Sequence, residues 1–389
     1  MIWFWWIYSG CVGGLMLALV LDATFGLPTI ADLTRPEFDR WPEGKHQGKH
    51  PSVSVIVPAL NEEAGIAACL NSLSAQDYDE IEIIAVDDRS TDRTGEIMEQ
   101  VAANLPGRVR VLHITELPPG WLGKTHAMWK AASQAAGDWL LFTDGDVLFR
   151  RDVIRRALAY VEATRADHSS VFPTMIFHSF GERMMMGFFQ LAGLAARPWK
   201  IPDPKSRACV GTGAFNLVRR SAYESIGTFE SLRLAVVEDL MLAYRVKGAG
   251  FSSRAAIGRG MVSVHWASGA MGIVRTLGKN LYAILGFRWY LALSVVCFML
   301  AFNVGPFFFV WLAPGWAKLG FAIYLACLFY AYWLFRNFNG ISPGYFLLHP
   351  VSTTLAAYAV LRSMVITIAR GGVIWRGTLY PLKELKKQN

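Results

Sequence analysis

Between residues 53 and about 165, runs of apolar and β-branched residues alternate with amphipathic stretches. The apolar runs predict strands at Val53–Val57, Ile81–Val86, Val109–Ile114 and Trp139–Thr143. The stretches between them carry apolar residues at helical spacing and predict helices at Glu62–Ala75, Asp92–Asn104, Lys124–Ala136 and Asp152–Thr164. This alternation predicts an α/β fold with a mainly parallel, doubly wound sheet, in which ligands gather at the carboxyl ends of the strands.

Long uncharged stretches lie on both sides of this region. Residues 2–21 are about long enough to cross a bilayer, and they lack the basic start of a cleaved signal peptide, so we expect a retained anchor. Three more apolar spans lie near Trp289–Leu312, Lys318–Phe335 and Tyr345–Ala369. We therefore expect five segments: a transmembrane anchor (1–22), a linker (23–51), an α/β domain (52–280), a C-terminal membrane module (281–370) and a basic cytoplasmic tail (371–389).

The charges are distributed as a membrane protein would require. The net charge is +8, but after Asp239 a single acidic residue, Glu384, faces 15 Lys and Arg. These basic residues flank apolar spans, where anionic headgroups attract them, and do not line one polar face, so we expect a membrane partner and no nucleic acid. Basic residues that follow the first span place the α/β domain in the cytoplasm by the positive-inside rule. The five cysteines lie far apart and form no CxxC pair, which argues against a zinc site or a disulfide framework.

Two carboxylates stand one residue apart in Thr143-Asp-Gly-Asp146, where the fourth predicted strand ends. Asp144 and Asp146 could bind a hard divalent cation that neutralises a diphosphate. Two acids and a glycine are also ordinary residues of a solvated turn.

A second acidic pair, Asp87 and Asp88, ends the second predicted strand. A carboxylate here can accept hydrogen bonds from a nucleobase or a ribose. The alternative is a role at a helix N-terminus. Both can hold if Thr91 or Asp92 caps the following helix, which would leave Asp87 and Asp88 free for a ligand.

The segment Gly120-Trp-Leu-Gly-Lys-Thr125 resembles part of a phosphate-binding P-loop. The P-loop pattern requires a glycine at position 118, which is Pro118 here, so an ATPase is disfavoured. Lys124 can still meet a diphosphate as a point charge at a helix start.

The last motif is Val237-Glu-Asp-Leu240, which opens a predicted helix over Glu238–Lys247. Asp239 could accept a proton from an attacking hydroxyl group. An acidic residue at this position often only stabilises the helix dipole.

Taken in order, these motifs resemble those of the membrane-bound family 2 glycosyltransferases. The matching segments are VSVIVPALNEE (53–63), AVDDRSTDRT (85–94), GWLGKTHAM (120–128), FTDGDV (142–147), GTGAFNLVRR (211–220) and VEDLMLAYRVKGAG (237–250). The tail Ile374–Tyr380 is similar to that of the lipid-directed members, which act on carotenoids, hopanoids or ceramide.

The resemblance implies a GT-A fold, a nucleotide-sugar donor (often a UDP-sugar), Mg²⁺ or Mn²⁺, and inversion at the anomeric carbon. It also implies residue roles. Asp239 would be the general base, and Asp144 with Asp146 would hold the metal next to the donor. The other donor-binding positions would be Pro58, Ala59, Glu62, Asp87 and Asp88 at the nucleotide and Lys124 at the diphosphate.

One motif of the family's processive synthases, QxxRW, is absent. Arg275-Thr-Leu-Gly-Lys-Asn280 stands at the corresponding place, and Lys279 or Arg275 could contact the diphosphate instead. We therefore expect a single transfer to a lipid-soluble acceptor at the cell (inner) membrane. A processive polysaccharide synthase and a non-catalytic membrane scaffold remain the alternatives, and a transporter is disfavoured because Arg362 is the one charge well inside a span.

The predicted topology contains a conflict. Three crossings after a cytoplasmic domain would leave the tail outside, yet Arg370, Arg376, Lys383, Lys386 and Lys387 should stay inside. Arg362 would cost roughly 2.5–3.5 kcal/mol at the bilayer centre, and Pro350 interrupts the start of the last span. We therefore predict that 345–369 enters or lies along the cytoplasmic leaflet and returns Trp375–Tyr380 towards the active site. The alternative is an ordinary crossing.

Overall fold

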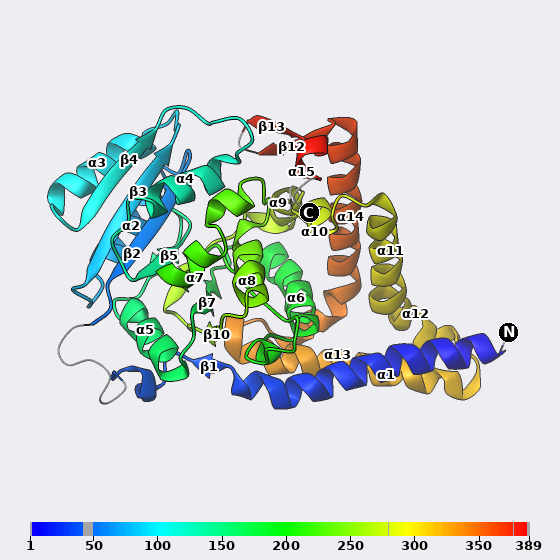
Figure 1. The fold of residues 1–389 in the computed structure, drawn as a ribbon. Helices are drawn as coiled ribbons and strands as arrows, with labels where there is room; N and C mark the ends of the chain where they lie inside the picture. The colour runs from blue at the N-terminus through cyan, green and yellow to red at the C-terminus, as the bar shows by residue number, and fades with distance from the viewer. Residues whose placement is uncertain (1, 42–49, 279, 376, 387–389) are drawn as a thin grey trace. The chain divides into compact units, whose positions relative to one another are not determined.

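The apolar runs form one eight-stranded sheet in a computed structural model, which describes residues 2–41, 50–278, 280–375 and 377–386 (Figure 1). In order across the sheet, its strands are β1 (Ala31–Asp32), β10 (Ser253–Ile257), β7 (His168–Phe172), β9 (Asn216–Arg219), β5 (Trp139–Phe142), β2 (Val53–Ala59), β3 (Ile81–Asp88) and β4 (Val109–Ile114). β9 runs antiparallel to both of its neighbours, and the other pairs are parallel. The predicted mainly parallel α/β fold is confirmed.

The sheet belongs to a unit, called here the sheet unit, made of residues 30–176 and 199–265. Its helices are α2 (Ile66–Ser74), α3 (Thr94–Asn104), α4 (Gly123–Ala132), α5 (Val153–Thr164), α7 (Arg220–Ser225) and α8 (Glu238–Gly248). A small second sheet joins β6 (Leu148–Phe149), β11 (Val262–Val264) and β8 (Thr174–Met175). 3₁₀ turns lie at Pro36–Phe38 and Phe229–Leu232. The largest differences from the predicted helices are at α2, which begins at Ile66 and not at Glu62, and at α4, which ends at Ala132 and not at Ala136.

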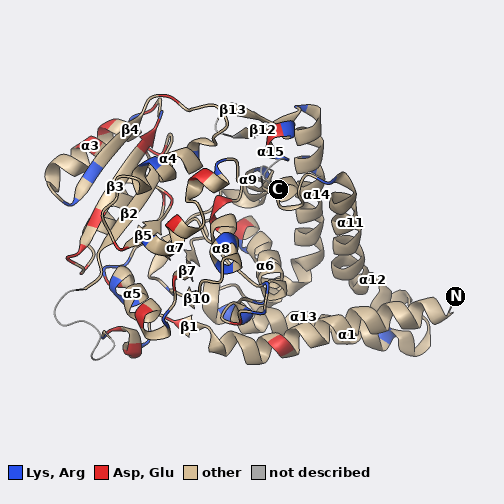
Figure 2. Cartoon of the chain, viewed as in Figure 1, with Lys and Arg blue, Asp and Glu red and all other residues tan. Residues whose placement is uncertain are grey.

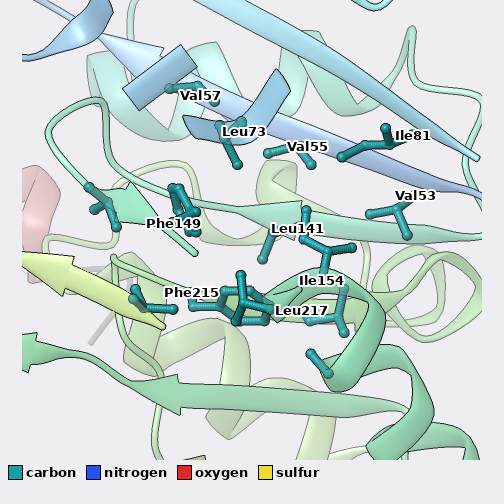
Figure 3. Close-up of a cluster of buried hydrophobic side chains, with 14 of the residues drawn as sticks. Val53, Val55, Val57, Leu73, Ile81, Leu141, Phe149, Ile154, Phe215 and Leu217 are labelled. Atoms are coloured by element: carbon teal, nitrogen blue, oxygen red, sulfur yellow. The ribbon is translucent and has the colours of Figure 1, made fainter. Parts of the chain in front are cut away.

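Both faces of the sheet are buried, as strand alternation requires. Val53, Val55 and Val57 of β2 lie in one core with side chains of α2 and α5 (Figure 3). Ile56 of the same strand lies in the other core, with side chains of α4 and α8. Each fully buried Val, Leu or Ile contributes about 1.5–3 kcal/mol. The two cores hold the strands at a set spacing and so position the loops at their carboxyl ends.

Residues 2–29, 177–198 and 266–386 form a second unit, the helical unit. Its helices are α1 (Ile2–Gly26), α6 (Phe180–Ala195), α9 (Gly269–Leu277), α10 (Leu281–Ile284), α11 (Trp289–Met299), a π-helical segment (Leu300–Val304), α12 (Gly305–Leu312), α13 (Lys318–Asn339), α14 (His349–Ala369) and α15 (Leu382–Leu385). A hairpin of β12 (Gly372–Trp375) and β13 (Thr378–Pro381) precedes α15. 3₁₀ turns lie at Leu27–Thr29, Gly315–Ala317 and Pro343–Leu348, and another at Pro198–Lys200 joins the two units.

Four helical stretches in this unit are long and apolar enough to cross a membrane: Ile2–Thr29, Trp289–Leu312, Gly315–Asn339 and Pro343–Ala369. Figure 2 shows few charged residues on them, whereas charges are frequent on the sheet unit. α1 and α13 lie side by side, because Gly13 of α1 and Gly320 of α13 let the two backbones approach closely. The four spans expected from the sequence are therefore present as helices.

The start of α14 is tied to its neighbours by a polar network inside the helical unit. The His349 imidazole lies 3.0 Å from the Tyr332 hydroxyl and 3.2 Å from the Asn303 carboxamide oxygen. Near the other end of α14, the Ser363 hydroxyl donates to the carbonyl of Gly278 and accepts from the amide of Tyr282. The end of α14 thus lies beside the segment that leads into α11, and α14 packs antiparallel to α11. Whether 345–369 crosses the membrane stays a prediction.

The structure differs from the expected segments in three places. α1 continues to Gly26, and Asp22, expected to end the span, lies inside it and pairs with Arg197 at 2.7 Å. Within the expected linker 23–51, β1 joins the sheet through β10, because Leu33 beside it is fully buried in the core. The expected domain 52–280 is also interrupted, since α6 and residues 266–278 belong to the helical unit. α6 carries the Met- and Phe-rich stretch and packs against α9 and α14.

Candidate active site

The loops after β2 and β3 are joined by hydrogen bonds between side chains and backbone. Asn61 and Arg89 both have positive φ (56° and 64°), a conformation that costs free energy for residues other than glycine and is concentrated at functional sites. The Asn61 side-chain oxygen accepts from the Thr91 amide at 2.8 Å. The Ser90 hydroxyl in turn accepts from the Asn61 amide at 3.1 Å. These reciprocal bonds connect the loops after β2 and β3 into one surface, called here the nucleotide platform because the predicted nucleotide-binding residues lie on it.

Asp87 and Asp88, at the end of β3, have different partners. Asp87 accepts from the Ser90 amide at 3.1 Å and faces His113 at 3.0 Å. Asp88 is buried and forms a two-point ion pair with the Arg89 guanidinium at 2.8 and 3.0 Å. Each carboxylate has a partner within the protein, and its contact with a ligand stays a prediction. Consecutive side chains of a strand point to opposite faces, so the two carboxylates have different partners, His113 and Arg89.

The end of β2 lies between the two acidic pairs. Pro58 and Ala59 are buried and pair with Val86 and Asp87 of β3. On the other side, a side chain at Gly145 would contact the methyl group of Ala59 at 3.3 Å. The sheet order β5-β2-β3 therefore brings the Asp144–Asp146 turn next to the predicted nucleotide platform, and Glu62 is near enough to Asp146 to affect its charge.

The Asp144–Asp146 turn follows β5 and packs against the Gly211–Gly213 turn. The Asp144 amide donates to the Gly213 carbonyl at 2.9 Å. A Cβ at Gly213 would contact an Asp144 carboxylate oxygen, so a larger residue there would require the Asp144 side chain to move. Removal of water from around the Asp146 carboxyl, and the negative charges of Asp144 and Glu62, raise the pKa of Asp146 to about 6.

Lys124, in the first turn of α4, bridges two carboxylates. Its ammonium group lies 2.5 Å from Asp144 and 2.5 Å from Glu238. Burial alone would lower the pKa of Lys124, but these two negative charges raise it. Lys124 lies at the start of α4, which begins at Gly123, as expected. The sequence did not predict its two ion pairs, and its contact with a diphosphate stays a prediction.

Asp239, at the start of α8, lies in the same group of charges. Burial of its carboxyl group and the charge of Glu238 raise the pKa of Asp239 to about 7, against the opposing effect of Lys124. A carboxylate with this pKa is suited to general base catalysis near neutral pH. Lys124, Phe142, Thr143, Gly213, Glu238 and Asp239 are among the residues that line one pocket.

A buried network positions the backbone of Asp239. The Asn216 side chain donates to the Asp239 carbonyl at 3.1 Å and faces the His168 Nε2 at 2.7 Å. Burial lowers the pKa of His168 to about 4, so the ring is neutral and donates to Asn216. A Cβ at Gly211 would overlap the Asp239 carbonyl, so the 211–213 turn packs directly on the start of α8.

The residues present fit a divalent cation bound together with a ligand. Among the described residues, no three His, Cys, Asp or Glu side chains are placed to hold a metal ion by themselves. Asp144 and Asp146 supply hard oxygen ligands, and burial of the Asp146 carboxyl group together with the negative charges of Asp144 and Glu62 raises its pKa, an effect that a bound cation would oppose. Mg²⁺ bound by one or two carboxylates takes its remaining ligands from phosphates and water.

Comparison with known proteins identifies the family. The Glycosyl transferase family 2 profile matches residues 54–227. The putative glycosyltransferase EpsE of Bacillus subtilis is 30% identical over 214 residues, which cover 52% of this chain and 68% of that protein. The chain belongs to glycosyltransferase family 2. The resemblance inferred from the sequence is thus confirmed.

Other relatives of this family 2 chain are similar over shorter or more divergent stretches. A 4,4'-diaponeurosporenoate glycosyltransferase of Staphylococcus haemolyticus is 39% identical over 112 residues, 28% of this chain and 27% of that protein. The chain therefore matches about a quarter of that relative's length. The structure of the mannosyltransferase PcManGT from Pyrobaculum calidifontis, in complex with GDP-Man and Mn²⁺, superposes with a TM-score of 0.53 at 18% identity, over 94% of this chain and 99% of that one. This likeness supports the GT-A fold.

The structure groups most of the predicted site residues of the family 2 chain. Lys124, Asp144 and Asp239 lie together, and Asp146 is on the same turn as Asp144. Pro58, Ala59, Glu62, Asp87 and Asp88 surround the neighbouring strand ends. Lys279 lies outside the described residues. Sequence reasoning missed Glu238 and His113. Glu238 stands beside Asp239 in the same motif, whereas His113 has no motif to mark it.

Proposed function

We propose that the chain transfers a sugar from a nucleotide-diphosphate donor to the hydroxyl group of a membrane-dissolved acceptor, with inversion at the anomeric carbon. The observation that carries the proposal is the pocket shared by Lys124, Glu238 and Asp239, in which the pKa of Asp239 is raised to about 7. A carboxylate that is half ionised at neutral pH and shares a pocket with a cationic group is suited to the displacement of a diphosphate by a hydroxyl group.

The proposed reaction is a single displacement. Asp239 accepts the proton of the acceptor hydroxyl as the acceptor oxygen forms a bond to the anomeric carbon. The bond from that carbon to the diphosphate oxygen breaks, and its electron pair leaves with the diphosphate. A divalent cation held by Asp144 and Asp146 would neutralise the charge that develops there. Lys124 adds a fixed positive charge, and Asn216 keeps the backbone of Asp239 in place.

The donor would lie along the strand ends. Asp87 and the loops after β2 and β3 would hold the nucleoside, with the diphosphate between Lys124 and the Asp144–Asp146 turn. A uridine nucleotide is the expectation from the family resemblance. The metal is Mg²⁺ or Mn²⁺ by the same argument, and a nucleotide sugar places the sheet unit in the cytoplasm.

Several features support a lipid acceptor. Four helices are long and apolar enough to cross a membrane, and α6 carries Met184–Met186 and Phe188–Phe189 in the helical unit. Methionine and phenylalanine form adaptable apolar surfaces. The name of the Staphylococcus haemolyticus relative, which refers to a carotenoid acid, is consistent with this choice.

The test is release of free nucleotide diphosphate from a panel of nucleotide sugars, with Mn²⁺ and a membrane lipid extract. We expect release from one donor that depends on the extract and is lost in Asp239→Asn. A single sugar per acceptor, seen by mass spectrometry of the lipid fraction, distinguishes the enzyme from a processive synthase. No release with any donor would contradict the proposal and leave a non-catalytic scaffold.

A further inference from the structure

The imidazole of His113 stands between two carboxylates at the end of β4. His113 is directly opposite Asp87 in the parallel pairing of β3 and β4. Its Nδ1 lies 3.0 Å from an Asp87 oxygen, and its Nε2 lies 2.8 Å from a Glu99 oxygen. Asp87 comes from β3 and Glu99 from α3, and these are the charged groups that face the ring. The proposed function uses Asp87 but assigns nothing to His113 or Glu99.

We propose that His113 is a positioning residue for the nucleoside end of the donor site, which fixes the Asp87 carboxylate while the imidazole is protonated and releases it when the imidazole loses its proton. This inference rests on the proposed function. It adds to that function a residue that controls donor affinity and a direction for the pH dependence of donor binding.

The hydrogen bonds require the protonated ring. An ionised carboxylate can only accept hydrogen bonds, so two carboxylates are both satisfied only if both ring nitrogens donate. The hydrogen bond to Glu99, followed by that to Asp87, raises the pKa of His113 above its ordinary value. The complete bridge is therefore present below this raised pKa, and it is lost as the pH rises through it.

The rest of the environment makes Asp87 depend on this bridge. One Asp87 oxygen accepts from the Ser90 amide, and the other faces His113. Each oxygen keeps a second lone pair for a donor group on a base or ribose. A Cβ at Gly95 of α3 would lie 2.6 Å from the second oxygen. The backbone of α3 therefore packs directly against the Asp87 carboxylate, with no side chain between them. When Ser90 and His113 hold the two Asp87 oxygens, the carboxylate cannot rotate, so its remaining lone pairs point in one direction.

Binding and turnover should then respond to pH in opposite directions. Loss of the His113 proton weakens donor binding at higher pH, whereas ionisation of Asp239 increases turnover at higher pH. Both His113 and Glu99 are about half exposed, with side-chain exposures of 45% and 58%, so water and salt weaken the bridge. We expect a change in nucleotide affinity of roughly 5–10-fold, not a complete loss.

The experiment is titration of the full chain in detergent with UDP and, separately, GDP in the presence of Mn²⁺, from pH 5.5 to 9. For the wild type, we expect affinity to fall by roughly 5–10-fold across one titration midpoint. Glu99→Gln removes one negative charge next to the ring and should move this midpoint to lower pH. Glu96→Gln is the matched control on the same helix, because Glu96 pairs with Arg93 and should leave the midpoint unchanged.

Replacement of the ring completes the test. His113→Ala should bind as weakly at low pH as the wild type does at high pH, without a midpoint, and turnover at saturating donor should change less than about twofold. His113→Asn, whose amide can still donate to Asp87, should recover part of the affinity without the pH dependence. An unshifted midpoint in Glu99→Gln, or wild-type affinity in His113→Ala, would overturn the inference about His113 but leave the proposed function standing. If the wild type binds neither nucleotide, the inference and the proposed function fail together.

Discussion

The two acidic pairs at the carboxyl edge of the sheet have similar sequences but different surroundings. Asp87 and Asp88 follow β3, and Asp144 and Asp146 follow β5, with β2 between them. At the first pair, His113 faces Asp87 and Arg89 pairs with Asp88. At the second, Asp144 shares the ammonium group of Lys124 with Glu238, and Asp146 has no salt bridge among those of the described residues. Each carboxylate of the first pair therefore has a basic side chain of its own, whereas the second pair shares one ammonium group with Glu238.

This difference indicates what each pair can bind. Burial of the carboxyl groups, and then repulsion from neighbouring negative charges, raise the pKa of Asp146 to about 6 and that of Asp239 to about 7. A divalent cation would relieve that repulsion, so the second pair is suited to a metal. The carboxylates of the first pair already have basic side chains, His113 and Arg89, as partners. They are suited to accept neutral hydrogen-bond donors, such as those of a base or a ribose.

The largest expected effect comes from removing the metal. EDTA should reduce transfer to the background rate, and Mn²⁺ or Mg²⁺ should restore it, because the second pair has too little positive charge to stabilise a leaving diphosphate. Asp146→Asn should raise the Mn²⁺ concentration needed for half-maximal transfer, whereas Asp88→Asn at the first pair should leave that concentration unchanged. Full activity in enzyme without bound metal would show that the second pair does not act as a metal site, which is the proposed difference between the two pairs.

The next largest effect is expected for Asp239→Asn. Loss of a general base lowers turnover by about 10²–10⁴-fold. Nucleotide binding should stay within about twofold of the wild type, since Asn has nearly the same volume. Single-turnover kinetics together with nucleotide titration measure the two quantities separately. If donor affinity falls and turnover does not, Asp239 binds the donor and is not the base.

Lys124→Met tests whether one cation controls the second pair. At saturating donor, the wild-type transfer rate should fall as the pH drops through about 7, because protonated Asp239 cannot accept a proton. Without Lys124, the pKa of Asp239 rises further, and the midpoint should move up by about one unit or more. The pH dependence of turnover measures the shift. An unchanged midpoint would mean that Lys124 and Asp239 do not interact in the working enzyme.

The smallest effect is expected at the first pair, in Arg89→Ala. This change leaves the buried Asp88 carboxylate without its two-point partner and should destabilise the sheet unit by about 1–3 kcal/mol. Unfolding in denaturant measures the loss. Arg89→Ala combined with Asp88→Asn should recover most of it, since no unpaired charge then remains. Equal destabilisation in the single and double variants would show that packing, and not charge, holds this loop.

Local patterns in the sequence predicted most of the sheet. The strand Val109–Ile114 was predicted with its observed limits, and β2 and β3 extend only two residues beyond the prediction. Strand alternation and helical spacing depend on neighbouring residues, so they can be read without knowing the fold. The start of α2 was misplaced, because the Glu62 amide donates to the hydroxyl group of Thr94, the first residue of α3. That bond joins residues 32 positions apart.

The carboxylates of the site were evident from the sequence, because strand ends and acidic residues are both local features. Their partners were decided only by the tertiary structure. Lys124 meets Glu238, which is 114 positions away, and His113 meets Asp87 through the register of β3 and β4. Ion pairs, burial and the resulting pKa values depend on distance through space, and a few ångströms separate a bridged carboxylate from a free one. The sequence alone therefore determined which charged groups are present at the sheet edge. Packing determined which carboxylates have a basic partner and which do not.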